Sequence, residues 1–100
     1  MYEIIFLSEA FDDIEQAGKW YAEQKKLLDI DFIEETFSRM DGLQSDSVLY
    51  KKAYRGLSRI LIKRFPYAVY FKKDKRKRVI VVFGVLHTKQ SDSRLMERKE

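Results

Sequence analysis

The sequence contains one histidine, and its position raises the possibility of acid/base chemistry. His87 follows the apolar run VIVVFGVL, residues 79–86, and is followed by Thr88 and Lys89. An imidazole at the end of such a strand is either an acid/base group at the rim of a sheet or a polar residue where the sheet meets water. The residues alone leave both interpretations open.

Basic residues mixed with tyrosines form a second group of chemical interest. Arg59 and Lys63 alternate with isoleucines, so a strand would project both cations from one face. Three more cations lie just upstream: Lys51, Lys52 and Arg55. Basic and aromatic side chains together suit single-stranded RNA, which offers phosphates and stackable bases. The alternative is an ordinary solvent-exposed sheet face.

The residue inventory excludes several kinds of site. The chain has no cysteine and therefore no disulfide or thiolate metal site, and one histidine without cysteine does not make a convincing transition-metal site. No glycine-rich phosphate loop or nucleophile elbow is present. We therefore expect neither a metal nor a cofactor.

Charge divides the sequence into two halves. Residues 1–48 hold twelve acidic and four basic residues, whereas residues 49–100 hold four acidic and sixteen basic ones. The basic half predicts attraction to polyanions, with nucleic acid the leading candidate. The alternative is that the opposite charges face each other or water. The basic run at 72–78 is most simply a solvated hairpin tip, and the alternative is a contact with phosphate.

The apolar patterns predict one α+β domain over residues 1–100. Period-3.6 patterns predict two helices, and β-branched and aromatic runs predict strands before and after them. The expected strands are 2–7, 58–65, 67–73 and 78–87, and the expected helices are 9–24 and 28–43. An antiparallel sheet with the helical hairpin on one face would bury both apolar stripes. The N-terminus MYEIIF predicts neither a signal peptide nor a transmembrane helix.

The sequence also predicts the core aromatic residues, the role of Gly84 and the structure of the C-terminal tail. We assign Trp20, Phe32 and Phe37 to the core. Gly84, inside the last strand, predicts a β-bulge or a close approach of other atoms to the backbone. The charged tail after Gln90 is expected to be a short helix or frayed.

Three segments in this order resemble the RelE/ParE superfamily of bacterial toxins from type II toxin–antitoxin pairs. They are LSEAFDDIEQAGKWY, the phenylalanine of DIDFIEE, and IKRFPYAVYFKKDKRKRVIVVFGVLHTKQSD, and the resemblance covers nearly the whole chain. It implies an N-terminal strand, a helical hairpin and a three-stranded antiparallel meander, with the helices on one face of the sheet.

The resemblance also implies a function. RelE-like toxins enter the ribosomal A site and cut mRNA, whereas ParE-like toxins poison DNA gyrase. Both kinds are neutralised by a small antitoxin whose disordered segment wraps the toxin. The expected protein is thus a cytoplasmic toxin with no membrane contact, assembled with its antitoxin into a hetero-oligomer.

One departure from the superfamily bears on the choice between these activities. RelE-like ribonucleases have an arginine just after the tyrosine that opens the middle strand of the meander, but here Tyr67 is followed by Ala68. If the chain is a metal-independent ribonuclease, the resemblance makes His87 the acid/base group and makes three cations the phosphate-stabilising residues: Arg59, Lys63 and Lys89. The alternative is a non-catalytic toxin that inhibits gyrase, or one that only binds its antitoxin or nucleic acid.

Overall fold

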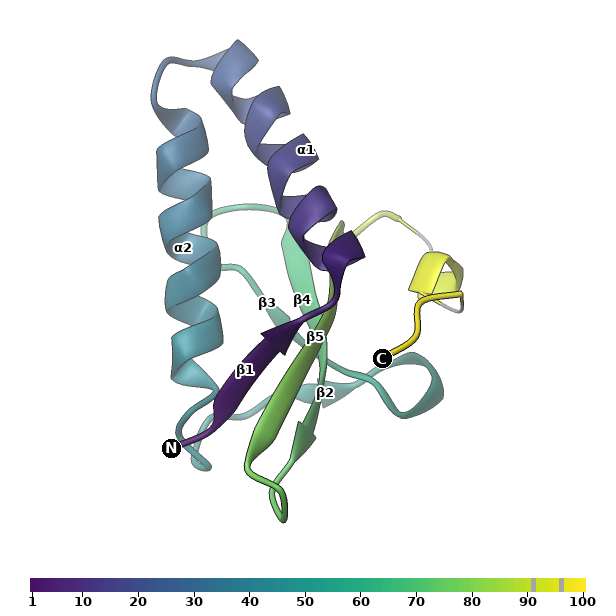
Figure 1. The fold of residues 1–100 in the computed structure, drawn as a ribbon. Coiled ribbons are helices and arrows are strands. Elements are labelled where there is room, and N and C mark those ends of the chain that lie inside the picture. The colour runs from purple at the N-terminus through teal and green to yellow at the C-terminus, as the bar shows by residue number, and fades with distance from the viewer. Residues whose placement is uncertain (91, 96) are drawn as a thin grey trace.

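The computed structural model describes residues 1–90, 92–95 and 97–100. Figure 1 shows a strand, two adjacent helices and then a strand meander. The elements, in chain order, are β1 (Glu3–Phe6), α1 (Ser8–Gln24), α2 (Leu28–Gly42), β2 (Lys51–Lys52), the 3₁₀ turn η1 (Tyr54–Gly56), β3 (Ser58–Leu61), β4 (Tyr67–Asp74), β5 (Val79–His87) and the 3₁₀ turn η2 (Asp92–Leu95). This order confirms the predicted α+β class and the three-stranded meander.

The sheet is mixed, so the expectation of a wholly antiparallel sheet was wrong. Its strand order is β1-β5-β4-β3-β2, and β1 runs parallel to β5 with Ile4 opposite Ile80. A parallel pair needs a long connection between its strands, and the helical hairpin with the meander provides it. The two-residue β2, paired with β3, was not predicted.

The main core lies between the helices and one face of the sheet, which we call the helix side. Strand residues alternate between the two faces, so every second residue of β4 points to this core, as does every second residue of β5 up to an interruption between Val82 and Val85. The helices contribute residues at helical spacing: Ala10, Ile14, Ala17, Tyr21, Phe32 and Met40. The sheet contributes mainly β-branched residues: Ile60, Val69, Phe71, Ile80, Val82 and Val85.

A smaller apolar cluster covers the opposite face, which we call the tail side. Ala68, Tyr70, Phe83 and Leu86 of the sheet pack there with Leu7, Leu57 and Leu95. Leu95 belongs to η2, the short yellow coil beside the C-terminal end in Figure 1. The predicted short helix in the tail is therefore present only as this 3₁₀ turn, while Ser91 and Met96 lie outside the described residues.

Of the three aromatic residues predicted to be core, only Phe32 is fully buried. Trp20 is 55% exposed and Phe37 is 37% exposed. Trp20 directly precedes the buried Tyr21, and one helical step of about 100° turns its side chain away from the sheet. Trp20 of α1 and Phe37 of α2 each lie next to the buried apolar stripe of their helix and not within it.

Gly84 combines both features that its position predicted. The pairing of β4 with β5 shifts register between Tyr70 and Phe71, which marks a bulge at Phe83 and Gly84. A side chain at position 84 would also collide with its surroundings. An added Cβ atom would meet the Arg98 guanidinium, and would lie 2.8 Å from Leu95 Cδ2 and 3.0 Å from Asp13 Oδ2.

The end of β5 has no neighbouring strand on the β1 side, and side chains take over its hydrogen bonds. β1 pairs only as far as Val82. Beyond it, the Val85 N–H donates to Asp13 Oδ2 at 2.9 Å, Arg98 Nη1 donates to the Phe83 carbonyl at 2.9 Å, and the His87 N–H donates to Gln90 Oε1 at 2.8 Å. These contacts satisfy backbone groups that burial would otherwise leave unpaired.

Candidate functional site

Arg59 and Lys51 lie on the tail side of the sheet. Arg59 is directly opposite Tyr70 on β4, and its Nη1 donates to the Tyr70 hydroxyl at 3.3 Å. Lys51 is opposite Arg59 on β2 and therefore shares its face. The tyrosine contact fixes the guanidinium over the sheet.

His87 lies on the other face. Its cross-strand partner is Tyr67, and the two rings meet edge to face with centroids 5.2 Å apart. Tyr67 in turn packs against Phe32 of α2 on the helix side. The sheet therefore separates His87 from Arg59.

The imidazole of His87 is also engaged. Its Nδ1 accepts a hydrogen bond from the backbone N–H of Lys89 at 3.0 Å. A neutral imidazole has one ring nitrogen with a free lone pair, and in His87 this lone pair is occupied. The arrangement favours a structural role for His87 over that of a general base.

The two residues that open β4 offer no general base either. Burial, with a smaller contribution from the charge of Asp13, raises the pKa of Tyr67, so this phenol stays protonated and cannot serve as a base. Ala68 is completely buried, with Leu61 and Leu86 as its cross-strand neighbours. The position where RelE-like ribonucleases carry an arginine is thus inside an apolar cluster.

The remaining predicted cations are spread over the molecule. β3 ends at Leu61, so Lys63 lies in the turn before β4 and does not share a strand face with Arg59. Lys89 follows β5, and Arg55 lies in η1 with a left-handed backbone at φ 51°. Lys52 pairs with Ser58 at the opposite end of β3 from Lys63. The structure does not gather the predicted cations around one point.

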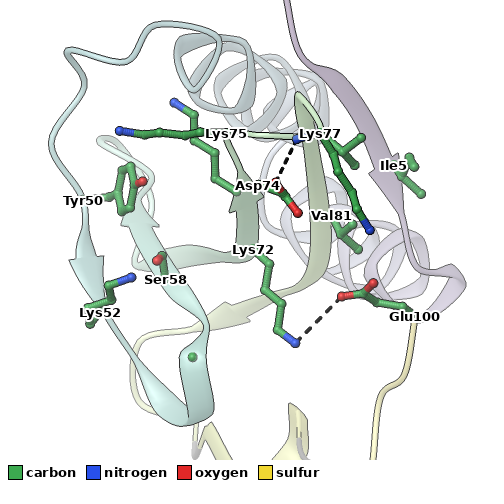
Figure 2. A pocket seen from close by; sticks show the side chains of 13 residues that line it. Ile5, Tyr50, Lys52, Ser58, Lys72, Asp74, Lys75, Lys77, Val81 and Glu100 are labelled. Atoms are coloured by element: carbon green, nitrogen blue, oxygen red, sulfur yellow. Dashed lines mark hydrogen bonds and ion pairs between the residues drawn. The ribbon is translucent and has the colours of Figure 1, made fainter.

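Lysines do gather at the β4–β5 hairpin, around a cavity of about 680 Å³. Figure 2 shows four of them projecting from β2, β4 and the hairpin turn: Lys52, Lys72, Lys75 and Lys77. Two carboxylates, Asp74 and Glu100, also line the cavity. We call this site, defined by the four lysines, the lysine basin.

A fifth lysine, Lys73, is buried beneath the basin. The Lys73 side chain is only 1% exposed, and its Nζ lies 3.2 Å from Asp46 Oδ1 and 4.6 Å from the centre of the Tyr2 ring. Arg78 lies against the same ring at 4.1 Å. Tyr2 also donates a 2.7 Å hydrogen bond from its hydroxyl to Asp46 Oδ1. These contacts join the N-terminus and the loop after α2 to the hairpin.

The Tyr2–Asp46 contact predicts pH-dependent stability. The hydrogen bond to Tyr2 is the main reason that the pKa of Asp46 lies below its usual value, and it raises the pKa of Tyr2. The stabilisation by Asp46 is therefore present above the usual carboxyl pKa and is lost as the pH falls through the lowered one. For Tyr2 the stabilisation is present below the usual phenol pKa and is lost as the pH rises through the raised one.

Asp46→Asn is expected to flatten the pH profile of the free energy of unfolding at both its acid and its alkaline ends. Urea denaturation across the pH range measures this effect. Asp41→Asn is the matched control, because Asp41 is exposed and makes no ion pair with the residues that the structure describes. Equal pH profiles for Asp46→Asn and the unmodified chain would contradict the prediction.

Sequence reasoning missed two groups of residues. The basin lysines 72, 75 and 77 were interpreted first as a solvated hairpin tip, with a phosphate contact only as the alternative, and the cavity between them was not predicted. The Asp13–Arg98 pair left no sequence signal, because the two residues are 85 positions apart.

Within the described ranges, no cluster of acidic or histidine side chains is suited to hold a metal ion, and no helix has the length and apolar character to cross a membrane.

Comparisons with known proteins place this architecture in a family. Residues 4–92 match the model of the ParE toxin of the type II toxin–antitoxin system parDE. A solved structure of the chromosomal ParDE system from P. aeruginosa aligns with a TM-score of 0.75 at 12% identity, over 87% of this chain and 96% of that one. The isolated E. coli RelE toxin aligns with a TM-score of 0.60 at 16% identity, over 94% and 92%.

A search of curated protein sequences gave no match. At these identities the structural similarities show the fold, while the family model spans most of the sequence and defines the membership. The chain belongs to the ParE toxin family of type II toxin–antitoxin systems, within the RelE/ParE superfamily.

Proposed function

We propose that this toxin arrests growth by binding and inhibiting DNA gyrase, and that it does not cut mRNA. The observation that carries the proposal is the separation of His87 from Arg59 by the sheet, with the buried Ala68 in place of a cation. Cleavage through a 2′-hydroxyl needs a base, an acid and phosphate-binding cations around one phosphate. A toxin that acts by binding needs no such cluster.

We further propose that a cognate antitoxin neutralises the toxin. The groove beside β3 suits a peptide with apolar and acidic residues, because Leu49 and Leu61 are exposed beside Lys51 and Arg59. Apolar side chains of the antitoxin would cover the leucines, and its carboxylates would pair with the cations. The family membership and the likeness to a ParDE system support this partner.

Induced expression in a bacterial host tests the proposal. Growth should stop, DNA breaks should accumulate, and the purified chain should inhibit supercoiling by gyrase. Messenger RNA should show no new 5′ ends at A-site codons. His87→Ala should preserve all of these effects, because inhibition by binding needs no acid/base group.

Three outcomes would overturn the proposal. Cleavage of mRNA in the ribosomal A site that disappears in His87→Ala would establish a ribonuclease. Growth arrest without either DNA breaks or mRNA cleavage would indicate another target. Normal growth, with the chain still captured by its antitoxin, would indicate a toxin that has lost its activity. A thermal melt of His87→Ala checks that the variant is folded in each case.

A further inference from the structure

The lysine basin carries positive charge that the protein itself does not neutralise. Lys52, Lys75 and Lys77 are exposed and make no ion pair with any residue that the structure describes. Lys72 is 3.8 Å from Glu100, but both side chains are about half exposed, and such a pair stabilises little in water. Four ammonium groups around one cavity repel one another, and a polyanion would relieve this repulsion.

The basin is also rigid beneath its exposed lysines. Lys73 alternates with Lys72 along β4, and it is buried among Tyr2, Tyr50 and Asp46. The turn that carries Lys75 and Lys77 is closed by a 2.9 Å hydrogen bond from the Lys77 N–H to Asp74 Oδ1. These contacts hold the backbone of Lys72, Lys75 and Lys77 in place before any ligand arrives, which lowers the entropic cost of binding.

We propose that the lysine basin binds the phosphodiester backbone of duplex DNA. Lysine offers a point charge that suits a phosphate without reading sequence. The proposal goes beyond gyrase inhibition and does not depend on it, because it concerns direct contact between the toxin and DNA.

The absence of a free stacking surface favours a duplex over a single strand. Single-strand binders stack bases on aromatic side chains. The one aromatic residue lining the basin among the described residues is Tyr50, whose ring already packs edge to face on Phe71 with centroids 5.1 Å apart. The apolar residues of the basin, Ile5, Val79 and Val81, are aliphatic.

The side chains that line the basin favour DNA over RNA. A protein that selects RNA needs groups that bind the 2′-hydroxyl. Here Ser58 is buried, and the carboxylates of Asp74 and Glu100 repel the phosphate next to any 2′-hydroxyl that they could bind. The basin therefore presents ammonium groups for phosphates and few groups for a 2′-hydroxyl.

Fluorescence anisotropy with the purified full chain and a labelled mixed-sequence DNA duplex of about 30 base pairs tests the proposal. Four phosphate contacts predict that log K falls with log salt concentration with a slope of about −3.6. The triple variant Lys72→Gln/Lys75→Gln/Lys77→Gln should bind at least about tenfold more weakly at low salt, with a slope near −1. All three side chains are exposed, so the variant should remain folded.

The matched control is Lys19→Gln/Lys25→Gln/Lys26→Gln, which removes the same charge from α1 and the turn after it. It should change the affinity less than about twofold, because these lysines lie outside the basin. Equal weakening in the two triple variants would show that only net charge matters and would overturn the proposal. Tighter binding of single-stranded RNA, duplex RNA or poly-glutamate than of duplex DNA would overturn it as well. Gyrase is absent from this assay, so its result is separate from that of the supercoiling test.

Discussion

Replacing Arg98 with methionine is expected to lower the free energy of unfolding by about 3 kcal/mol, because it breaks a buried ion pair. Arg98 and Asp13 are only 10% and 11% exposed, and two hydrogen bonds of 2.6 and 3.0 Å join the guanidinium to the carboxylate. The substitution would leave the carboxylate of Asp13 and the carbonyl of Phe83 without this donor. Methionine keeps most of the apolar volume, so the effect reports mainly on the lost polar contacts.

Urea denaturation of the purified chain measures this change. Arg94→Met is the matched control in the same tail, and it should cost less than about 0.5 kcal/mol because Arg94 is exposed. In the double variant Asp13→Asn/Arg98→Met, the loss should be smaller than the sum of the two single losses by about 1 kcal/mol or more. Similar small losses for Arg98→Met and Arg94→Met would show that the pair does not hold the tail.

The bulge at Gly84 explains why the sequence could not place His87 relative to Arg59. Val82 faces the helix side, and strict alternation from Val82 would put His87 on the tail side together with Arg59. Phe83 instead packs in the tail-side cluster, and a Cβ atom at Gly84 would meet Leu95 of the same cluster, so the alternation is reversed after these two residues. The sequence indicated a bulge at Gly84, but only the pairing register shows which side chains it moves to the other face.

Local patterns were sufficient for much of the fold. The helical periodicity predicted both helices within a residue at each end, and the apolar runs predicted β4 and β5 equally well. Contacts between distant segments were not predictable in this way. The parallel pairing of β1 with β5 and the Asp13–Arg98 pair both join the two ends of the chain, and neither has a local signature.

The same limit applies to the candidate site. The cations of the basic half were visible in the sequence. Whether each one can bind a ligand depends on whether its side chain is paired, buried or exposed without a partner. Lys72 and Lys73 are neighbours in sequence, yet the Lys73 side chain is 1% exposed and the Lys72 side chain is 46% exposed. Neighbouring residues on a strand face opposite ways, and only the packing around β4 decides which of the two lysines is buried.

Phe32→Ala is expected to lower the free energy of unfolding by about 4 kcal/mol, a large share of the total stability of a domain of this size. Phe32 is completely buried and lies at the centre of an aromatic cluster. Its ring centroid is 5.2 Å from that of Tyr21, 5.3 Å from that of Phe65 and 5.1 Å from that of Tyr67. Truncation would leave a cavity between α1, α2 and the start of β4, and neighbouring rings cannot collapse fully into it.

Trp20→Ala is the control that separates burial from aromatic character. Trp20 is larger than Phe32, but its side chain is 55% exposed. It contacts the ring of Tyr21 at the border of the same aromatic cluster. Truncating it should therefore lower the free energy of unfolding by only about 1 kcal/mol. Equal losses for Phe32→Ala and Trp20→Ala in urea denaturation would contradict the assignment of the core.

If Phe32→Ala does not fold, Phe32→Leu should still fold with a loss of about 1 kcal/mol, because leucine fills most of the space. Since Tyr67 contacts both Phe32 and His87, the Phe32→Leu variant should also show a changed environment for the His87 ring in NMR spectra, whereas Trp20→Ala should leave it unchanged.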